Sequence, residues 1–197
     1  DRQADINARD NTTSSPLHYA STNGHHQCIE LLLDRQADIN ARDNTTSSPL
    51  HSASWNGHRQ CVALLLDRHA DIDARDSRGT RPLHVAAKNG HHQCIELLLD
   101  RQAYVDARDF RGTRPLHNAA TNGHRQCVEL LLDRRADIND RNYVMVSPLA
   151  YAIMNGHHQC IALLLDRHAN VNAEEDKDAL PPLHSASQHG HRQFIEL

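Results

Sequence analysis

The sequence predicts an all-α fold, a solenoid of stacked helix pairs, and three observations predict it. A 33-residue unit, clearest at residues 10–42, returns along the whole chain of 197 residues. Prolines recur at that step, at Pro16, Pro49, Pro82, Pro115 and Pro148. Each of these units also holds a Cys-Ile or Cys-Val pair followed by three leucines. A fixed period of this size is typical of stacked supersecondary units rather than of one globular core.

The first helix of the unit is expected at residues 16–23. Ser15-Pro16 is typical of an N-cap followed by proline at the first helical position, where the missing N–H costs nothing. Leu17 and Ala20 are expected to face inward. Gly24 ends the helix, because glycine readily adopts the left-handed C-cap conformation.

The second helix is expected at residues 25–34. Cys28, Ile29 and the leucines at 31–33 form a broad apolar face on it. Helices this short are not stable alone. They are therefore expected to bury this face against neighbouring copies.

The repeated frame, SPLHYA-x3-GH-x2-CI-x-LLL-x3-ADINA, closely resembles the ankyrin repeat and its TPLHxAA…GHxxVVxLLLxxGADVNA hallmark. The resemblance covers essentially the whole chain, in six consecutive matches. It implies helix–turn–helix repeats with short β-hairpin-like loops. We expect a single domain over residues 1–197, with a partial repeat at 1–9 and repeats that begin near residues 10, 43, 76, 109, 142 and 176.

The chain departs from the family frame at the turns. Repeats three and four carry Arg81 and Arg114 where the family has a threonine. The glycine of the LLLxxGAD segment is replaced throughout, by Gln36, His69, Gln102, Arg135 and His168. A non-glycine residue in a left-handed cap costs about 1 kcal/mol, so we expect lower stability than in an ideal consensus array.

Charge and hydropathy exclude several classes of protein. A net charge of −4 does not suggest nucleic-acid binding. Adjacent Asp-Arg pairs such as Asp34-Arg35 are expected to balance each other locally. No apolar run approaches the roughly 18 residues of a membrane span, and no signal peptide opens the chain. We expect a monomer inside the cell, in the cytoplasm or the nucleus.

The five cysteines are expected in the core, each on its second helix. Neighbouring repeats stack roughly 10 Å apart, whereas a disulfide needs Cα atoms within about 7 Å. Reduced thiols are typical of an intracellular protein. His25 with Cys28 has zinc-ligand spacing, but only two ligands would converge per repeat, so no metal and no cofactor are expected.

The resemblance implies a structural imidazole at one position of each first helix, bonded to the backbone of a neighbouring turn. These histidines are His18, His51, His84, His117 and His184. No residue stands apart from the repeat as a nucleophile or acid, so an enzyme is not expected. Asn40, Asn139 and Asn172 resemble ankyrin-repeat sites of asparaginyl hydroxylases, but they also match the family's hairpin consensus, and both interpretations stay open.

Both ends of the chain are cut within a repeat. Residues 1–18 are identical to residues 34–51, and the chain stops at Leu197, early in a second helix. We therefore expect a piece of a longer array.

Positions that differ between the copies indicate a binding surface, since identical positions serve the stack. They gather at the hairpin tips and at two positions of the first helix, regions that line the concave groove in the ankyrin family. The first of these helix positions carries Tyr19, Ser52, Val85, Asn118, Tyr151 and Ser185. Aromatic side chains and arginine dominate interface energies. The residues expected to contact a partner are Tyr19, Trp55, Arg78, Lys88, Phe110, Arg111, Tyr143, Val144, Tyr151 and Met154.

The sequence therefore predicts a scaffold that binds a partner protein through its groove. Two alternatives stay open: a structural spacer, or a regulatory ankyrin segment of a larger protein whose enzyme or channel lies elsewhere in the chain.

Overall fold

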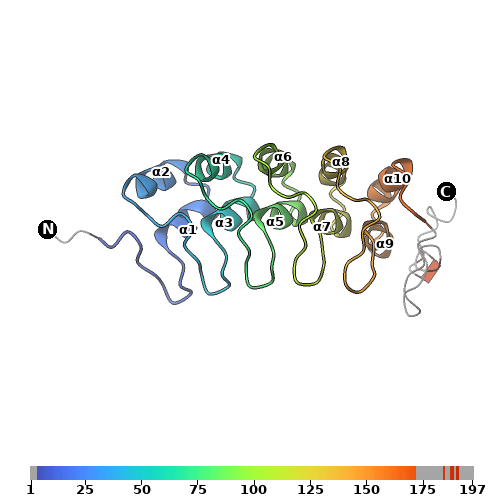
Figure 1. Cartoon of the computed structure of the whole chain (residues 1–197), viewed down its shortest axis with the longest axis horizontal. Helices are drawn as coiled ribbons and strands as arrows, with labels where there is room; N and C mark the ends of the chain where they lie inside the picture. Colours follow the sequence, from blue (N-terminus) through green and yellow to red (C-terminus); the bar gives the residue numbers. More distant parts are fainter. Residues whose placement is uncertain (1–3, 172–183, 185–186, 189, 191–197) are drawn as a thin grey trace. The chain divides into compact units, whose positions relative to one another are not determined.

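A computed structural model of the chain describes residues 4–171, 184, 187–188 and 190. Within residues 4–171 the chain forms ten α-helices and no β-strand (Figure 1). In order they are α1 (Pro16–Thr22), α2 (His26–Asp34), α3 (Pro49–Trp55), α4 (Arg59–Asp67), α5 (Pro82–Lys88), α6 (His92–Asp100), α7 (Pro115–Thr121), α8 (Arg125–Asp133), α9 (Pro148–Met154) and α10 (His158–Asp166). None of these helices is long and apolar enough to cross a membrane. Most of the predicted sixth repeat, including Ser185, lies outside the described residues.

The helix bounds confirm the prediction from proline and glycine. Each first helix begins at its proline, and α1 is preceded by Ser15 in an extended conformation. Gly24 adopts a φ of 73°, which ends α1 and redirects the chain into α2. The helices alternate between seven and nine residues in α1 to α4, one short pair per repeat.

The chain forms two compact units. The first takes in the described residues up to Ala86 together with Gln93–Tyr104, and the second takes in Ala87–His92 and the described residues from Val105 onward. In the first unit α1 packs on α2 and α3, and α4 packs on α2 and α3. In the second unit α7 packs on α8 and α9, and α10 packs on the same two helices.

The core of each unit is aliphatic and comes from the same frame positions. Leu17, Ile29, Leu50 and Leu65 are fully buried in the first unit, and Leu116, Leu131, Leu149 and Ile161 in the second. Because each pair buries its apolar face on the next, nine-residue helices are stable here although they would not be stable alone.

The prediction that every cysteine is buried is wrong for Cys28, which is exposed, whereas the other four are buried. Leu31 on the same helix is also 54% exposed. On a second helix this side faces the preceding repeat. In α6, for example, burial raises the pKa of Cys94 to about 11, and Arg59 and Cys61 of the preceding helix α4 also affect that pKa. No described helix precedes α1, so no described helix packs on this side of α2.

The non-glycine residues of the second loop adopt the left-handed conformation that the sequence predicts. Their φ angles are 64° at Gln36, 66° at His69, 69° at Gln102, 66° at Arg135 and 65° at His168. The hairpin tips show the same substitution, with Thr13, Thr46 and Met145 at positive φ where repeats three and four have glycine. The array therefore stores backbone strain at several loops.

Histidines join consecutive repeats, as the resemblance implied. His18 Nδ1 accepts the Ser15 N–H at 3.2 Å, so its Nε2–H donates to the Ser47 carbonyl at 3.0 Å. A second histidine, His58, bonds the Thr22 carbonyl through Nε2 at 2.9 Å. Its ring lies on Gly24, where an added Cβ would come within 2.7 Å of His58 Nδ1.

The expected balance between adjacent Asp-Arg residues is wrong. Asp34 pairs with Arg68 of the next repeat at 2.9 Å rather than with its neighbour Arg35. Asp67–Arg101 and Asp133–Arg167 repeat this pairing at 2.7 and 2.8 Å. The partners lie 34 residues apart in sequence, so these pairs link repeats. They are half-exposed, and each contributes little to stability.

Candidate partner-binding surface

Each hairpin tip is fixed by the acidic or amide side chain that opens it. Asp43 Oδ1 accepts the backbone N–H groups of Thr45 and Ser47 at 2.8 and 2.9 Å. Asp76 Oδ1 does the same for Arg78 and Thr80, at 2.8 and 2.7 Å. The side chains at these tips therefore project from a defined backbone rather than from a loose loop.

Neighbouring tips are also bonded to each other within each unit. The Asn44 N–H donates to the Thr12 carbonyl at 3.0 Å, and the Ser77 N–H donates to the Thr45 carbonyl at 2.9 Å. In the second unit the Tyr143 N–H donates to the Arg111 carbonyl at 2.9 Å. These bonds bring variable residues of consecutive repeats side by side.

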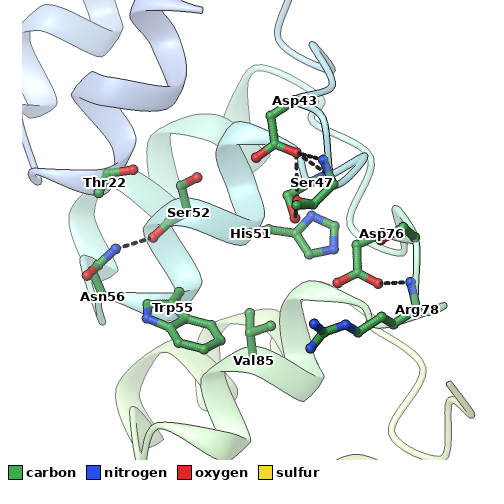
Figure 2. A pocket seen from close by; sticks show the side chains of 12 residues that line it. Thr22, Asp43, Ser47, His51, Ser52, Trp55, Asn56, Asp76, Arg78 and Val85 are labelled. Carbon is green, nitrogen blue, oxygen red and sulfur yellow. Dashed lines mark hydrogen bonds between the residues drawn. The ribbon is translucent and has the colours of Figure 1, made fainter. Parts of the chain in front are cut away.

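In the first unit the tips and first helices surround a hollow of about 370 Å³ (Figure 2). Trp55 and Arg78, both predicted from the sequence, line it. Trp55 is 47% exposed at the end of α3. Val85 of α5 also lines the hollow but is only 6% exposed, so this variable position is not exposed in every repeat.

Tyr19, the remaining predicted residue of the first unit, does not line the hollow. It is 54% exposed, and its hydroxyl donates to Asp10 Oδ2 at 2.6 Å. This bond, together with one from Thr12, lowers the pKa of Asp10 to about 2. The same bond raises the pKa of the Tyr19 hydroxyl.

In the second unit four predicted residues share the tips of repeats four and five. Phe110, Tyr143 and Val144 are 63%, 66% and 67% exposed, and Arg111 is exposed beside them. They form the most apolar tips in the described part of the chain. The Tyr143 ring lies on Gly112, where an added Cβ would come within 2.6 Å of the ring, and Arg108 Cζ is 6.0 Å from the ring centroid.

The other three predicted residues of this unit lie on first helices. Tyr151 is half-buried: its hydroxyl accepts the Asn142 Nδ2–H at 2.8 Å, and its ring meets His117 edge-on at 6.1 Å between centroids. Met154 is 43% exposed at the end of α9, and Lys88 is exposed at the end of α5. Tyr151 is thus partly a structural residue.

Two aspartates that the sequence did not single out, Asp43 and Asp76, also line the hollow. They recur in the frame and were attributed to the stack. A usable signal is the residue nine positions later, which is tyrosine in repeats one and five but Ser52, Val85 and Asn118 in the three repeats between them.

The described asparagines that resembled hydroxylation sites have backbone partners here. Asn40 Oδ1 accepts the Asp71 N–H at 2.9 Å, and Asn139 Oδ1 accepts the Asn170 N–H at 2.8 Å. Asn172 lies outside the described residues. Among the residues that are described, no three His, Cys, Asp or Glu side chains converge as they would around a metal ion.

The comparison with protein families agrees with this architecture. A model of ankyrin repeats in three copies matches residues 2–76, 69–142 and 145–197. Among curated proteins, none matches this sequence. The matched segments cover nearly the whole chain, and the repeat period, paired helices and linking histidines are those the frame requires. The chain belongs to the ankyrin repeat family.

Proposed function

We propose that this chain binds a partner protein through the face formed by its hairpin tips and the exposed ends of its first helices. Ankyrin repeats are generally protein–protein interaction modules, and their all-helical fold is typically non-enzymatic. The observation that carries the proposal is the meeting of two variable residues, Trp55 and Arg78, around one hollow on fixed tips.

The exposure of large apolar side chains at variable positions supports this surface. Leucines such as Leu17 and Leu50 are buried in the stack, and histidines such as His18 and His58 bond the neighbouring repeat. Trp55, Phe110 and Val144 instead expose large apolar areas. Apolar and aromatic groups of this kind are the usual anchors of an interface.

The five unpaired cysteines support a location inside the cell, in the cytoplasm or the nucleus. We propose that the chain acts there as a monomer.

Affinity purification with three parallel baits tests the proposal. The baits are the parent chain, the double variant Trp55→Ala/Arg78→Ala, and a control, Gln27→Ala/Gln60→Ala, which changes exposed residues of α2 and α4. A protein enriched by the parent and the control, but not by the Trp55/Arg78 variant, is then purified for calorimetry. We expect the variant to lose at least about 2 kcal/mol of binding free energy. A partner that binds the Trp55/Arg78 variant normally and loses affinity for the control would show that the opposite face is used.

A further inference from the structure

The hollow of the first unit lies where the tyrosine of the first helix is missing. In repeat one, Tyr19 stands nine residues after Asp10 and donates its hydroxyl to Asp10 Oδ2 at 2.6 Å. The matching residues in repeats two and three are Ser52 and Val85. Serine is too short to span this gap and valine has no hydroxyl, so both the space and the carboxylate oxygen are left open.

The two carboxylates of the hollow each keep an oxygen that has no partner among the described residues. Asp43 uses Oδ1 for the N–H and hydroxyl of Thr45 and the N–H of Ser47. Asp76 uses Oδ1 for the N–H groups of Arg78 and Thr80. Oδ2 of each aspartate is therefore available to a ligand.

Trp55 and Val85 give the wall of the hollow an apolar part. Figure 2 shows the indole of Trp55 and the side chain of Arg78 flanking Val85 in the hollow. Arg78 also lines the hollow, is exposed, and forms no ion pair with another described residue. A ligand for this hollow must combine an apolar stem with a group that carries positive charge and hydrogen-bond donors.

We propose that the hollow binds an arginine side chain of the partner protein, with its guanidinium on Asp43 and Asp76 and its stem against Trp55 and Val85. This inference rests on the proposed function, because it names the chemistry of the partner at that surface. Arginine fits better than lysine, because its planar group both stacks on an aromatic face and donates to carboxylates in a fixed fork. The positive charge of Arg78, which also lines the hollow, favours an acidic residue beside that arginine.

The proposal can be tested before the partner is known, because Trp55 is the only tryptophan in the chain. The probes are two peptides, acetyl-Gly-Arg-Gly-amide and its glutamine counterpart, titrated at millimolar concentrations. The readout is the NMR signal of the Trp55 indole N–H. We expect the arginine peptide to shift this signal saturably and to bind at least about fivefold more tightly than the glutamine peptide. Added salt should weaken the arginine peptide selectively.

The repeats themselves indicate which conservative substitutions the fold accepts at the aspartate position. Asn142 shows that asparagine holds a hairpin tip, since its Oδ1 accepts the N–H groups of Val144 and Val146 at 3.2 and 3.0 Å. Asp43→Asn and Asp76→Asn should therefore fold and each weaken the arginine peptide by about two- to fivefold. Asp10→Asn, outside the hollow, should leave its affinity unchanged. Ser52→Tyr, patterned on Tyr19, should abolish binding by filling the hollow.

Equal affinity for the two peptides, or no shift of the Trp55 signal with either, would overturn the inference. So would full affinity in both Asp43→Asn and Asp76→Asn. These results would leave the proposed function standing, since that depends on the partner's affinity for the Trp55/Arg78 variant and not on the arginine peptide.

Discussion

Arg81 and Asp73 form an ion pair, with 2.9 Å between Nη1 and Oδ1, that joins the N-cap position of α5 to the preceding hairpin. Arg114 and Asp106 form the same pair at 3.0 Å before α7. Both arginine side chains are only 12–13% exposed. The hairpin position of Asp73 and the N-cap position of Arg81 change together from repeat to repeat. The pairs, in chain order, are Asn7/Ser15, Asn40/Ser48, Asp73/Arg81, Asp106/Arg114 and Asn139/Ser147. A charged cap therefore occurs only where the hairpin before it carries a carboxylate.

This pairing predicts a compensating double variant. Asp73→Asn leaves the Arg81 guanidinium largely buried without its carboxylate, and should reduce the free energy of unfolding by about 1–2 kcal/mol. Asp73→Asn/Arg81→Ser recreates the Asn40/Ser48 combination and should recover at least half of that loss. Urea denaturation of the parent, both single variants and the double variant measures the coupling. Strictly additive losses would mean that the two positions change together for another reason.

The left-handed loop residues predict a stabilised variant. Gln36, Gln102 and Arg135 adopt φ angles of 64°, 69° and 66°, where an L side chain is strained. Glycine relieves this strain at some cost in unfolded-chain entropy, for a net gain of about 0.5 kcal/mol per site. The triple glycine variant should raise Tm by about 3–6 °C in a thermal melt. Alanine at the same three positions keeps the strain and should give no rise; a rise with alanine would mean that side-chain loss, not backbone relief, is responsible.

The buried histidines predict acid sensitivity above the range in which most carboxylates titrate. Burial lowers the pKa of His117 to about 4, although its bond to the Val146 carbonyl works against this shift. Burial lowers the pKa of His18 and His51 in the same direction. In the unfolded chain such imidazoles titrate near 6.5, so the unfolded state binds more protons between about pH 6.5 and 4. Stability should therefore fall as the pH is lowered through that window.

His117→Ala isolates this contribution. Ala150 takes the same frame position in repeat five and is buried there, so alanine is accommodated. The variant should have a lower Tm at pH 7, because a bond between repeats is lost, but a shallower decline from pH 6.5 to 4. Thermal melts across that range compare the two slopes. Asp140 has a pKa raised by burial and acts in the opposite direction, and it is the same in both proteins. Parallel slopes would exclude His117 as a source of the acid sensitivity.

The unequal burial of the cysteines predicts selective alkylation. Cys28 is exposed, whereas burial raises the pKa of Cys127 to about 12 and of Cys160 to about 11. Because the thiolate is the reactive form, iodoacetamide at pH 8 should label the folded chain at Cys28 only. Mass spectrometry counts the labels, with full labelling in denaturant as the reference. Cys28→Ser should remove the label from the folded chain, and a label that remained would reveal opening of a buried site.

Local signals made the helices predictable from the sequence. Proline at the first helical position and glycine at the C-cap act within a few residues, so Pro16 and Gly24 fixed α1 to within one residue. The left-handed loops followed in the same way, because the family frame demands that conformation whatever residue is present. Periodicity then gave the core, since Leu17 and Ile29 occupy repeated positions.

Features that depend on the distance between repeats were not predictable. The partner of Asp34 is Arg68, 34 residues on, because stacking rather than sequence proximity brings the two charges together. Cys28 has the same sequence context as its buried counterparts. It is exposed because no described helix packs on that side of α2. The hollow likewise depends on neighbouring repeats. Ser52 and Val85 are smaller than Tyr19, and this difference in size leaves a cavity only where two repeats stack side by side.

The apolar tips of the second unit provide a last prediction, in which Val144 is a cleaner probe than Tyr143. Both are about two-thirds exposed, at 67% and 66%. The Tyr143 ring also covers Gly112 and lies 6.0 Å from Arg108 Cζ, so Tyr143→Ala removes contacts within the fold as well as a contact surface. The position of Val144 is instead fixed by its backbone N–H, which donates a hydrogen bond to Asn142 Oδ1 at 3.2 Å. Val144→Ser keeps that bond and should leave Tm unchanged.

If the tips contact the partner, Val144→Ser should weaken binding by about 1 kcal/mol, and Tyr143→Ala should weaken it by about 1–2 kcal/mol while also lowering Tm. Calorimetry with the recovered partner gives the affinities, and thermal melts give the stabilities. Glu129→Ala, on the second-helix side of the same unit, is the control and should change neither by more than about 0.5 kcal/mol. Unchanged affinity in both tip variants would exclude Tyr143 and Val144 from the interface, because the thermal melts would show that the variants were folded when they were tested.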